Sequence, residues 1–208
     1  MRYLADDALE SRLAGSRGER SAGEYIAAPS FACRRRPAGE NGSWFQSLPV
    51  ASALNPHGPG GTGRNVIAAL EGQDPVLKNE WVVIGAHYDH LGEGGSSNST
   101  APGQRAIHNG ADDNASGVGA LLRVAERLST QEPPARSVLF IAFTAEESDL
   151  LGSDHFVSHA TITPGTMVAS AWTWWVASVR ARSSYMASTR PQNGAVFWSR
   201  PWNVQACQ

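Results

Sequence analysis

The chain has 208 residues, 41% of them hydrophobic, which is enough for one domain with a substantial buried core. Its formal net charge of -2 gives no sign of a nucleic-acid partner, and no apolar run approaches the roughly 20 residues that span a bilayer. Cys33 and Cys207 lie far apart and outside any motif, so a disulfide framework is not expected. The first residues are charged where the apolar core of a signal peptide would lie, so we expect no signal peptide in this chain.

The amino-terminal third predicts short helices and loops. Two amphipathic helices are expected around residues 7–13 and 21–27, separated by a Gly-Ser-Arg-Gly turn. Residues 29–63 have poor periodicity, and we interpret the basic run Arg34–Arg36 within them as a solvated loop. The segment 65–70 is a strand candidate. A turn at 71–75 leads from it to the next strand, so the two strands are expected to form a hairpin or an edge pair.

Residues 81–144 predict a β-α-β unit. The segments 81–86 and 137–144 are uncharged and rich in β-branched side chains, as in strands that are buried on both faces. Between them, Asn114 or Ser116 can cap a helix, and Glu132-Pro133-Pro134 ends it. The apolar positions of this helix recur at helical spacing: Val118, Leu121, Leu122, Ala125 and Leu128. Strand, helix, strand implies a right-handed parallel crossover, and the fold class is α/β.

Polar residues follow the first of these strands directly. His87 and Asp89 fall at its end, and α/β sheets bind ligands at the carboxyl ends of their parallel strands. In an extended segment the two side chains lie on one side, so Asp89 can hold one imidazole nitrogen and leave the other free for a metal. Taken alone, such a pair is more often structural. His90 and His108 flank the long Gly- and Ser-rich loop that follows and are candidates for substrate contact.

Two acidic pairs accompany His87. Glu146 and Glu147 follow the second strand, where one carboxylate can bind a metal while its neighbour acts as general base. Asp112 and Asp113 precede the helix. Each pair alone is explained by the helix dipole, which favours acids in a first turn. Together, however, four of these residues should meet at one edge of the sheet: His87, Asp112, Glu146 and Glu147. Imidazole and carboxylate ligands suit zinc, and two zinc ions that share an activated water suit amide hydrolysis.

Three motifs resemble the consecutive motifs of the co-catalytic di-zinc aminopeptidases, a family that includes glutamate carboxypeptidase-like enzymes. They are VVIGAHYDHLG, NGADDNASG and AFTAEESDLLGS. The resemblance extends to MRYLADDALESR and GRNVIAALEG, and so covers about residues 1–168. It implies a three-layer α/β/α fold with a mostly parallel central sheet, incomplete at its carboxyl terminus. It also implies removal of the amino-terminal residue from a peptide substrate, and an extracellular or periplasmic location.

The resemblance assigns roles to individual residues. It implies that His87 binds one zinc ion, that Asp112 bridges both ions, and that Glu147 binds the other. Glu146 would be the general base, and Asp89 would orient His87. Asp113 would follow the bridging residue, at a position where the family has a strained peptide bond.

The chain departs from the family pattern after about residue 168. The family has two further ligands, an Asp in a segment like N-x-D-M-V-G-R and a later His, and neither occurs here. After Asp154 there is no Asp, Glu or Lys, and five of the seven Trp residues lie between Trp172 and Trp202. We therefore expect a partial zinc peptidase domain over residues 1–168, followed by a non-homologous tail over residues 169–208 that is out of frame or disordered.

A shifted reading frame is our hypothesis for this change. Because tryptophan has one codon, the segment WTWWVA after Ala171 is encoded TGG-ACN-TGG-TGG-GTN-GCN. Regrouped one base earlier, with Ala171 ending in A, these bases can read M-D-M-V-G-R. A single-base insertion or deletion between about Met167 and Trp172 would produce the change. Each ion would then keep two protein ligands, so we expect weak zinc binding, poor activity and poor stability.

Two other classes of function fit parts of the chain. A non-catalytic binding module with a protease-like fold would lack metal, and the retained acidic and imidazole residues argue against it. A tail that binds a membrane or single-stranded nucleic acid is disfavoured, because Trp172, Trp174 and Trp175 share no helical face. His155 and His159 have i, i+4 spacing but no acidic partner, so we expect them to be exposed.

Overall fold

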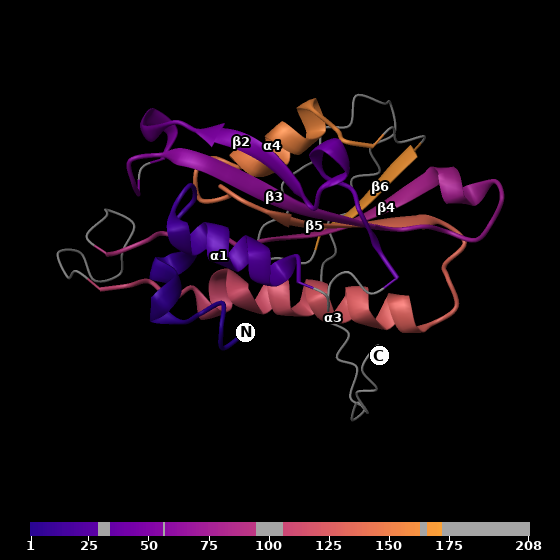
Figure 1. Cartoon of the computed structure of the whole chain (residues 1–208), viewed down its shortest axis with the longest axis horizontal. Helices are drawn as coiled ribbons and strands as arrows, with labels where there is room; N and C mark the ends of the chain where they lie inside the picture. Colours follow the sequence, from indigo (N-terminus) through magenta and orange to yellow (C-terminus); the bar gives the residue numbers. More distant parts are fainter. Residues whose placement is uncertain (29–33, 56, 95–105, 163–165, 172–208) are drawn as a thin grey trace, which may run out of the picture.

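The computed structural model describes residues 1–28, 34–55, 57–94, 106–162 and 166–171. Its centre is a six-stranded sheet, with α1 (Arg17–Ile26) and α3 (Gly117–Thr130) on one face and α4 (Leu151–Ser158) on the other (Figure 1). The expected α/β class is therefore confirmed. Both cysteines and the tail from residue 172 lie outside the described residues. None of the helices described has the length and apolar character that crossing a membrane requires.

The sheet is mixed, with the strand order β1-β3-β5-β4-β6 and with β2 also paired to β3. The strands are β1 (Arg36–Pro37), β2 (Phe45–Val50), β3 (Gly61–Leu70), β4 (Glu80–His87), β5 (Ser137–Phe143) and β6 (Thr166–Ala171). β4 is parallel to β5 and β6, whereas β3 is antiparallel to β1, β2 and β5. The expectation of a mostly parallel sheet is wrong, because antiparallel pairs outnumber parallel ones. The connection from β2 to β3 is too short for the crossover that a parallel pair needs.

Strands β3 and β4 do not form the expected hairpin. Instead, β5 lies between them, antiparallel to β3 and parallel to β4. The connection from β3, which includes the 3-10 helix Leu77–Asn79, crosses the start of β5. There the Ser137 hydroxyl accepts from the Gly72 N–H at 3.0 Å and donates to the Lys78 carbonyl at 2.6 Å. The predicted parallel unit of β4, α3 and β5 is confirmed.

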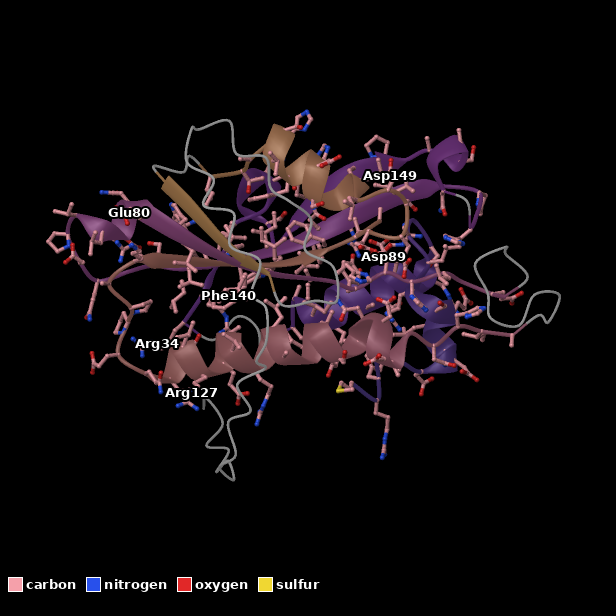
Figure 2. All side chains as sticks on the ribbon, turned by 180° about the vertical axis from the view of Figure 1, so that it is seen from behind. Arg34, Glu80, Asp89, Arg127, Phe140 and Asp149 are labelled. Atoms are coloured by element: carbon pink, nitrogen blue, oxygen red, sulfur yellow. The ribbon has the colours of Figure 1, made fainter. Side chains whose placement is uncertain are left out.

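Strand β5 is covered on both faces of the sheet, which explains why its sequence is uncharged. Val138 and Phe140 belong to the apolar cluster that includes α1 and α3, whereas Leu139 and Ile141 belong to the cluster that includes α4. Because successive side chains of a strand point to opposite faces, a strand covered on both faces is apolar throughout. In Figure 2, Phe140 lies between the sheet and α3. The helical spacing predicted for α3 is also confirmed, since its apolar side chains pack into the first cluster.

The sequence predicts that the basic run Arg34–Arg36 is a solvated loop, and this prediction is wrong for Arg35. Arg35 is buried and donates to the Ala125 carbonyl and the Ser129 hydroxyl. The exposed Arg34 donates to the carbonyls of Ser129 and Gln131 at 3.1 and 3.3 Å. These guanidinium groups satisfy carbonyls at the end of α3, where the helix dipole favours cations. Burial lowers the pKa of Arg35 to about 10.

The remaining short elements connect this framework. They are the 3-10 helices Asp7–Arg12, Glu40–Gly42 and Ser52–Leu54, and an irregular turn at Ala111–Ser116 that leads into α3. Strand β2 and two of these helices lie in the stretch for which the sequence predicted no regular structure.

Because β4 and β5 pair in parallel, the polar residues that follow each strand lie at the same edge of the sheet. His87 is opposite Phe143 in the last register pair of the two strands, so both strands leave the sheet at the same edge. In Figure 2, Asp89 and Asp149 lie toward one end of the molecule, and Glu80, which begins β4, lies at the other. The residues after β4 and the residues after β5 therefore meet at this edge.

Candidate metal centre

Asp89 joins the ends of β4 and β5. Its side chain is fully buried, and its two oxygens accept from the backbone N–H groups of Glu146 and Glu147 at 3.1 and 3.3 Å. This carboxylate fixes the turn that presents both glutamates. Its Oδ1 lies 3.6 Å from the His87 Nδ1, which is longer than a hydrogen bond. The buried Nδ1 has no hydrogen-bond partner among the described residues, so the orienting role of Asp89 toward His87 stays a prediction.

Glu146 and Glu147 lie in the turn between β5 and α4. The helix begins only at Leu151, so the simpler explanation of these acids as a first helical turn is wrong. The Glu146 Oε2 lies 3.9 Å from the His87 Nε2, and the Glu147 Oε1 lies 2.8 Å from the His90 Nδ1. Both carboxylates therefore face histidines at the end of β4 or shortly after it.

Asp113, rather than Asp112, contacts this group. Its Oδ1 lies 3.0 Å from the His87 Nε2. Both aspartates are exposed, but Asp112 supplies no atom to either carboxylate–imidazole group of the described residues. The turn Ala111–Ser116 has non-helical backbone angles at Asp113 and Asn114, with a cis peptide bond between them. Because Asp113 departs from helical backbone angles, its side chain does not follow the helical direction of its neighbour. Asp113 replaces Asp112 as the candidate for the bridging ligand.

Asn114 ties this turn to its surroundings. Its side-chain amide donates to the His87 carbonyl at 3.3 Å, and its side-chain oxygen accepts from the Gly117 N–H at 3.0 Å. Ser116 directly precedes α3 but makes no capping hydrogen bond, so of the two predicted residues it is Asn114 whose side chain caps an N–H of this helix. The Ser116 hydroxyl instead donates to the Asp112 carbonyl at 2.6 Å. Through Asn114, the position of Asp113 is set by both β4 and α3.

Arg12 links the amino-terminal segment to the site, and the sequence analysis missed it. Its fully buried guanidinium donates to the carbonyls of Tyr88, Asn109 and Gly110 at 2.7, 2.8 and 3.0 Å, and also to that of Leu4. Burial lowers the pKa of Arg12, while the charges of nearby carboxylates oppose the shift. The guanidinium therefore holds the chain on both sides of the loop that connects β4 to the acidic turn.

Negative charge dominates the centre. Burial acts to lower the pKa of His87, but its hydrogen bond to Asp113 and the charges of Asp89 and Glu146 outweigh burial and raise it to about 10. Burial raises the pKa of Glu146, and contact with His87 lowers that of Asp113. Without another cation, a proton on His87 offsets the clustered carboxylates. A divalent cation is the natural alternative source of that positive charge.

The donor atoms fit such a cation. Two groups of side chains each bring their ligand atoms within 4.8 Å of one another: His87 with Glu146 and Glu147, and His90 with Asp113 and Glu147. Tetrahedral zinc bound at about 2.0–2.2 Å separates its donors by about 3.4 Å, so small side-chain movements suffice. Imidazole and carboxylate donors are also the usual ligands of catalytic zinc. Glu147 is common to both groups.

Other histidines stay outside these groups. The rings of His155 and His159 stack at 4.4 Å on and just after α4. His159 is exposed as expected, whereas His155 is half-buried, so the expectation is wrong for His155. His108 lies close by, with its ring centroid 6.3 Å from that of His90. Within the described part of the chain, none of these three supplies a ligand atom to either group.

Sequence relatives match about half of the chain. YfbL, an uncharacterized protein of Escherichia coli K12, is 38% identical over 99 residues, which are 48% of this chain and 27% of YfbL. The aminopeptidase YwaD of Bacillus subtilis 168 is 33% identical over 98 residues, which are 47% of this chain and 18% of YwaD. The chain thus spans less than a third of the length of either relative.

Solved structures share the fold. A Zn-dependent exopeptidase from Parabacteroides distasonis has a TM-score of 0.56 and 23% identity, over 80% of this chain and 58% of that one. The glutaminyl cyclase of Porphyromonas gingivalis has a TM-score of 0.57 and 21% identity, over 81% of this chain and 56% of that one. The sequence model of Peptidase family M28 matches residues 65–170, just over half of the chain, and this range contains both candidate metal groups. The chain therefore belongs to peptidase family M28.

Proposed function

We propose that this chain is the catalytic part of a zinc-dependent aminopeptidase, which removes the amino-terminal residue of a peptide. One observation carries the proposal. His87, Asp113 and Glu147 come from three distant segments and converge with Glu146 at the edge where β4 and β5 end. Membership of family M28 and the aminopeptidase relative support peptide hydrolysis, and the zinc exopeptidase structure has the same fold.

Two zinc ions would be held by residues whose ligand atoms already lie close together. On this assignment His87 and Asp113 would hold one ion, and Asp113 and Glu147 would hold the second. Zinc, when bound, polarises the scissile carbonyl and makes a water more acidic. The carboxylate of Asp89 holds the turn that carries Glu147 and thereby positions this ligand.

Glu146 is left outside the ligand set and is the candidate general base. Its side chain is mostly buried beside His87, and burial raises the pKa of its carboxyl group. A raised pKa suits a group that accepts a proton from water and passes it to the leaving amine. Its backbone N–H is fixed by Asp89, so the carboxylate has a defined place relative to the ligands.

The proposal is tested by comparing Glu146→Gln with a matched surface variant, Glu132→Gln, in the full 208-residue chain. Zinc content is measured first, and then turnover of an aminoacyl-nitroanilide. We expect Glu146→Gln to keep its zinc and to lose turnover by at least about 100-fold, the scale of general-base catalysis. The exposed Glu132 should tolerate the same change without loss.

Three results would contradict the proposal. Turnover at the wild-type rate in Glu146→Gln would reject Glu146 as the general base. A wild-type chain that carries zinc but cleaves no amino-terminal residue would reject the aminopeptidase activity. A chain that binds no zinc would favour the non-catalytic module. A substrate with amino-terminal glutamine adds a check, because release of ammonia without peptide cleavage would indicate cyclisation instead.

A further inference from the structure

We propose that His90 is a protein ligand of the second metal ion, completing a three-ligand site with Asp113 and Glu147. This inference rests on the proposed zinc chemistry. The sequence favoured substrate contact for His90, but the structure places its imidazole against the carboxylates. A catalytic zinc ion usually has three protein ligands, and His90 would raise the count for this ion from two to three.

The geometry around His90 carries the inference. Its side chain is buried, and its Nδ1 lies 2.8 Å from the Glu147 Oε1. One atom each of His90, Asp113 and Glu147 lie within 4.8 Å of one another. The Nδ1 and the carboxylate oxygen are therefore at hydrogen-bond distance. Zinc takes the same two atoms, and the change from 2.8 Å to a tetrahedral donor separation moves them apart by roughly half an ångström.

The backbone holds His90 in place for this role. His90 forms a parallel bridge with Leu13, and the neighbouring Arg12 donates to the Tyr88 carbonyl at 2.7 Å. Between Tyr88 and His90, Asp89 is bonded to the turn of the two glutamates. The imidazole and its partner Glu147 are thus fixed through the same short segment. Such support favours metal binding by His90, because its side chain loses little conformational freedom when it binds the ion.

Other described side chains after Glu147 do not supply the missing ligand. The acids Asp149 and Asp154 and the histidines His155 and His159 contribute no atom to either group. His90 is the imidazole that contacts Glu147 directly.

Zinc titration of the full chain tests the inference, with zinc content and competition against a chromophoric chelator as readouts. His90→Asn is the decisive variant, because the asparagine amide can keep the hydrogen bond to Glu147 but is a poor zinc ligand. His90→Ala removes both interactions. His108→Asn is the matched control, since its ring lies 6.3 Å from that of His90 but outside both groups. Far-UV circular dichroism checks that each variant folds.

We expect the wild-type chain and His108→Asn to bind two zinc ions. In both His90 variants the second ion should bind at least about 100-fold more weakly, because loss of a mere partner of a ligand already costs 10–100-fold. Wild-type affinity in His90→Asn would reduce His90 to a hydrogen-bond donor and overturn the inference, as would a wild-type chain without a second zinc ion.

The same proteins separate this inference from the proposed function. Zinc binding that depends on His90, without peptide cleavage, would keep the ligand and reject the aminopeptidase. Peptide cleavage together with zinc binding that is unchanged in the His90 variants would support the aminopeptidase and reject His90 as a ligand.

Discussion

Replacing Arg12 with Met tests how the amino-terminal segment supports the metal centre. Arg12 is fully buried and donates to four backbone carbonyls, two of them directly before the turn that carries Asp113. Met fills a similar volume without donors. It also meets the same positive φ of 57° at this position, so backbone strain is unchanged.

The expected cost follows from the lost hydrogen bonds. A hydrogen bond from a charged donor contributes about 1.5–3 kcal/mol, and relief of the cost of burying the guanidinium offsets part of the loss. The four carbonyls lose their donor, and each buried carbonyl left unsatisfied costs about 1–3 kcal/mol, so a net loss of about 3–5 kcal/mol remains after that relief. We expect Arg12→Met to lose about this much, which is a large share of the about 5–15 kcal/mol that stabilises a typical domain. The free energy of unfolding of Arg12→Lys should lie between those of the wild type and Arg12→Met, because an ammonium keeps the charge but cannot reach all four carbonyls.

Urea unfolding followed by circular dichroism measures the effect. Arg17→Ala is the control, because Arg17 is 77% exposed and its 3.4 Å pair with Glu10 should contribute less than about 1 kcal/mol. A free energy of unfolding for Arg12→Met within about 1 kcal/mol of wild type would refute the reasoning. The zinc affinity of Arg12→Met should also fall, since the acidic turn loses its support.

Three further predictions concern other parts of the chain. Asp89→Asn leaves one of the two N–H groups that Asp89 accepts from without an acceptor, so urea unfolding should show a loss of about 1–3 kcal/mol in the free energy of unfolding. The exposed control Asp149→Asn should show no loss. Equal free energies of unfolding for the two variants would contradict this prediction. Burial raises the pKa of Glu19 above 4.5, so the folded state binds this proton more tightly, and its stability falls as pH rises from the unfolded toward the folded pKa. The advantage in unfolding free energy of Glu19→Gln over wild type should therefore grow from acid to neutral pH, and a constant difference would reject the cause. Finally, DNA sequencing across codons 168–171 should reveal a frame break, and an uninterrupted frame that cannot encode M-D-M-V-G-R would end that hypothesis.

Local patterns in the sequence predicted the framework of the site. The uncharged segments that became β4 and β5 and the helical spacing of α3 depend on neighbouring residues, so the sequence alone carries them. Their parallel pairing then brings His87 and the two glutamates to one edge, as expected. The types of donor atom were also visible in the sequence.

Other features needed the tertiary structure. The choice of Asp113 over Asp112 follows from an irregular turn, which the sequence pattern does not specify. The burial of Arg35 depends on the end of α3, which lies far along the chain.

Thus the sequence by itself determined the strands β4 and β5, the core of β3, the long helix and the kinds of side chain that gather at the sheet edge, because these follow from local apolar runs and helical spacing. Only the tertiary structure decided that β5 separates β3 from β4, that Asp113 faces His87, and that Arg12 supports the loop. The contacts of Arg12 with Tyr88 and Gly110 join residues 76 and 98 positions apart. Such pairings are selected by the packing of the whole domain, and no short stretch of sequence specifies them.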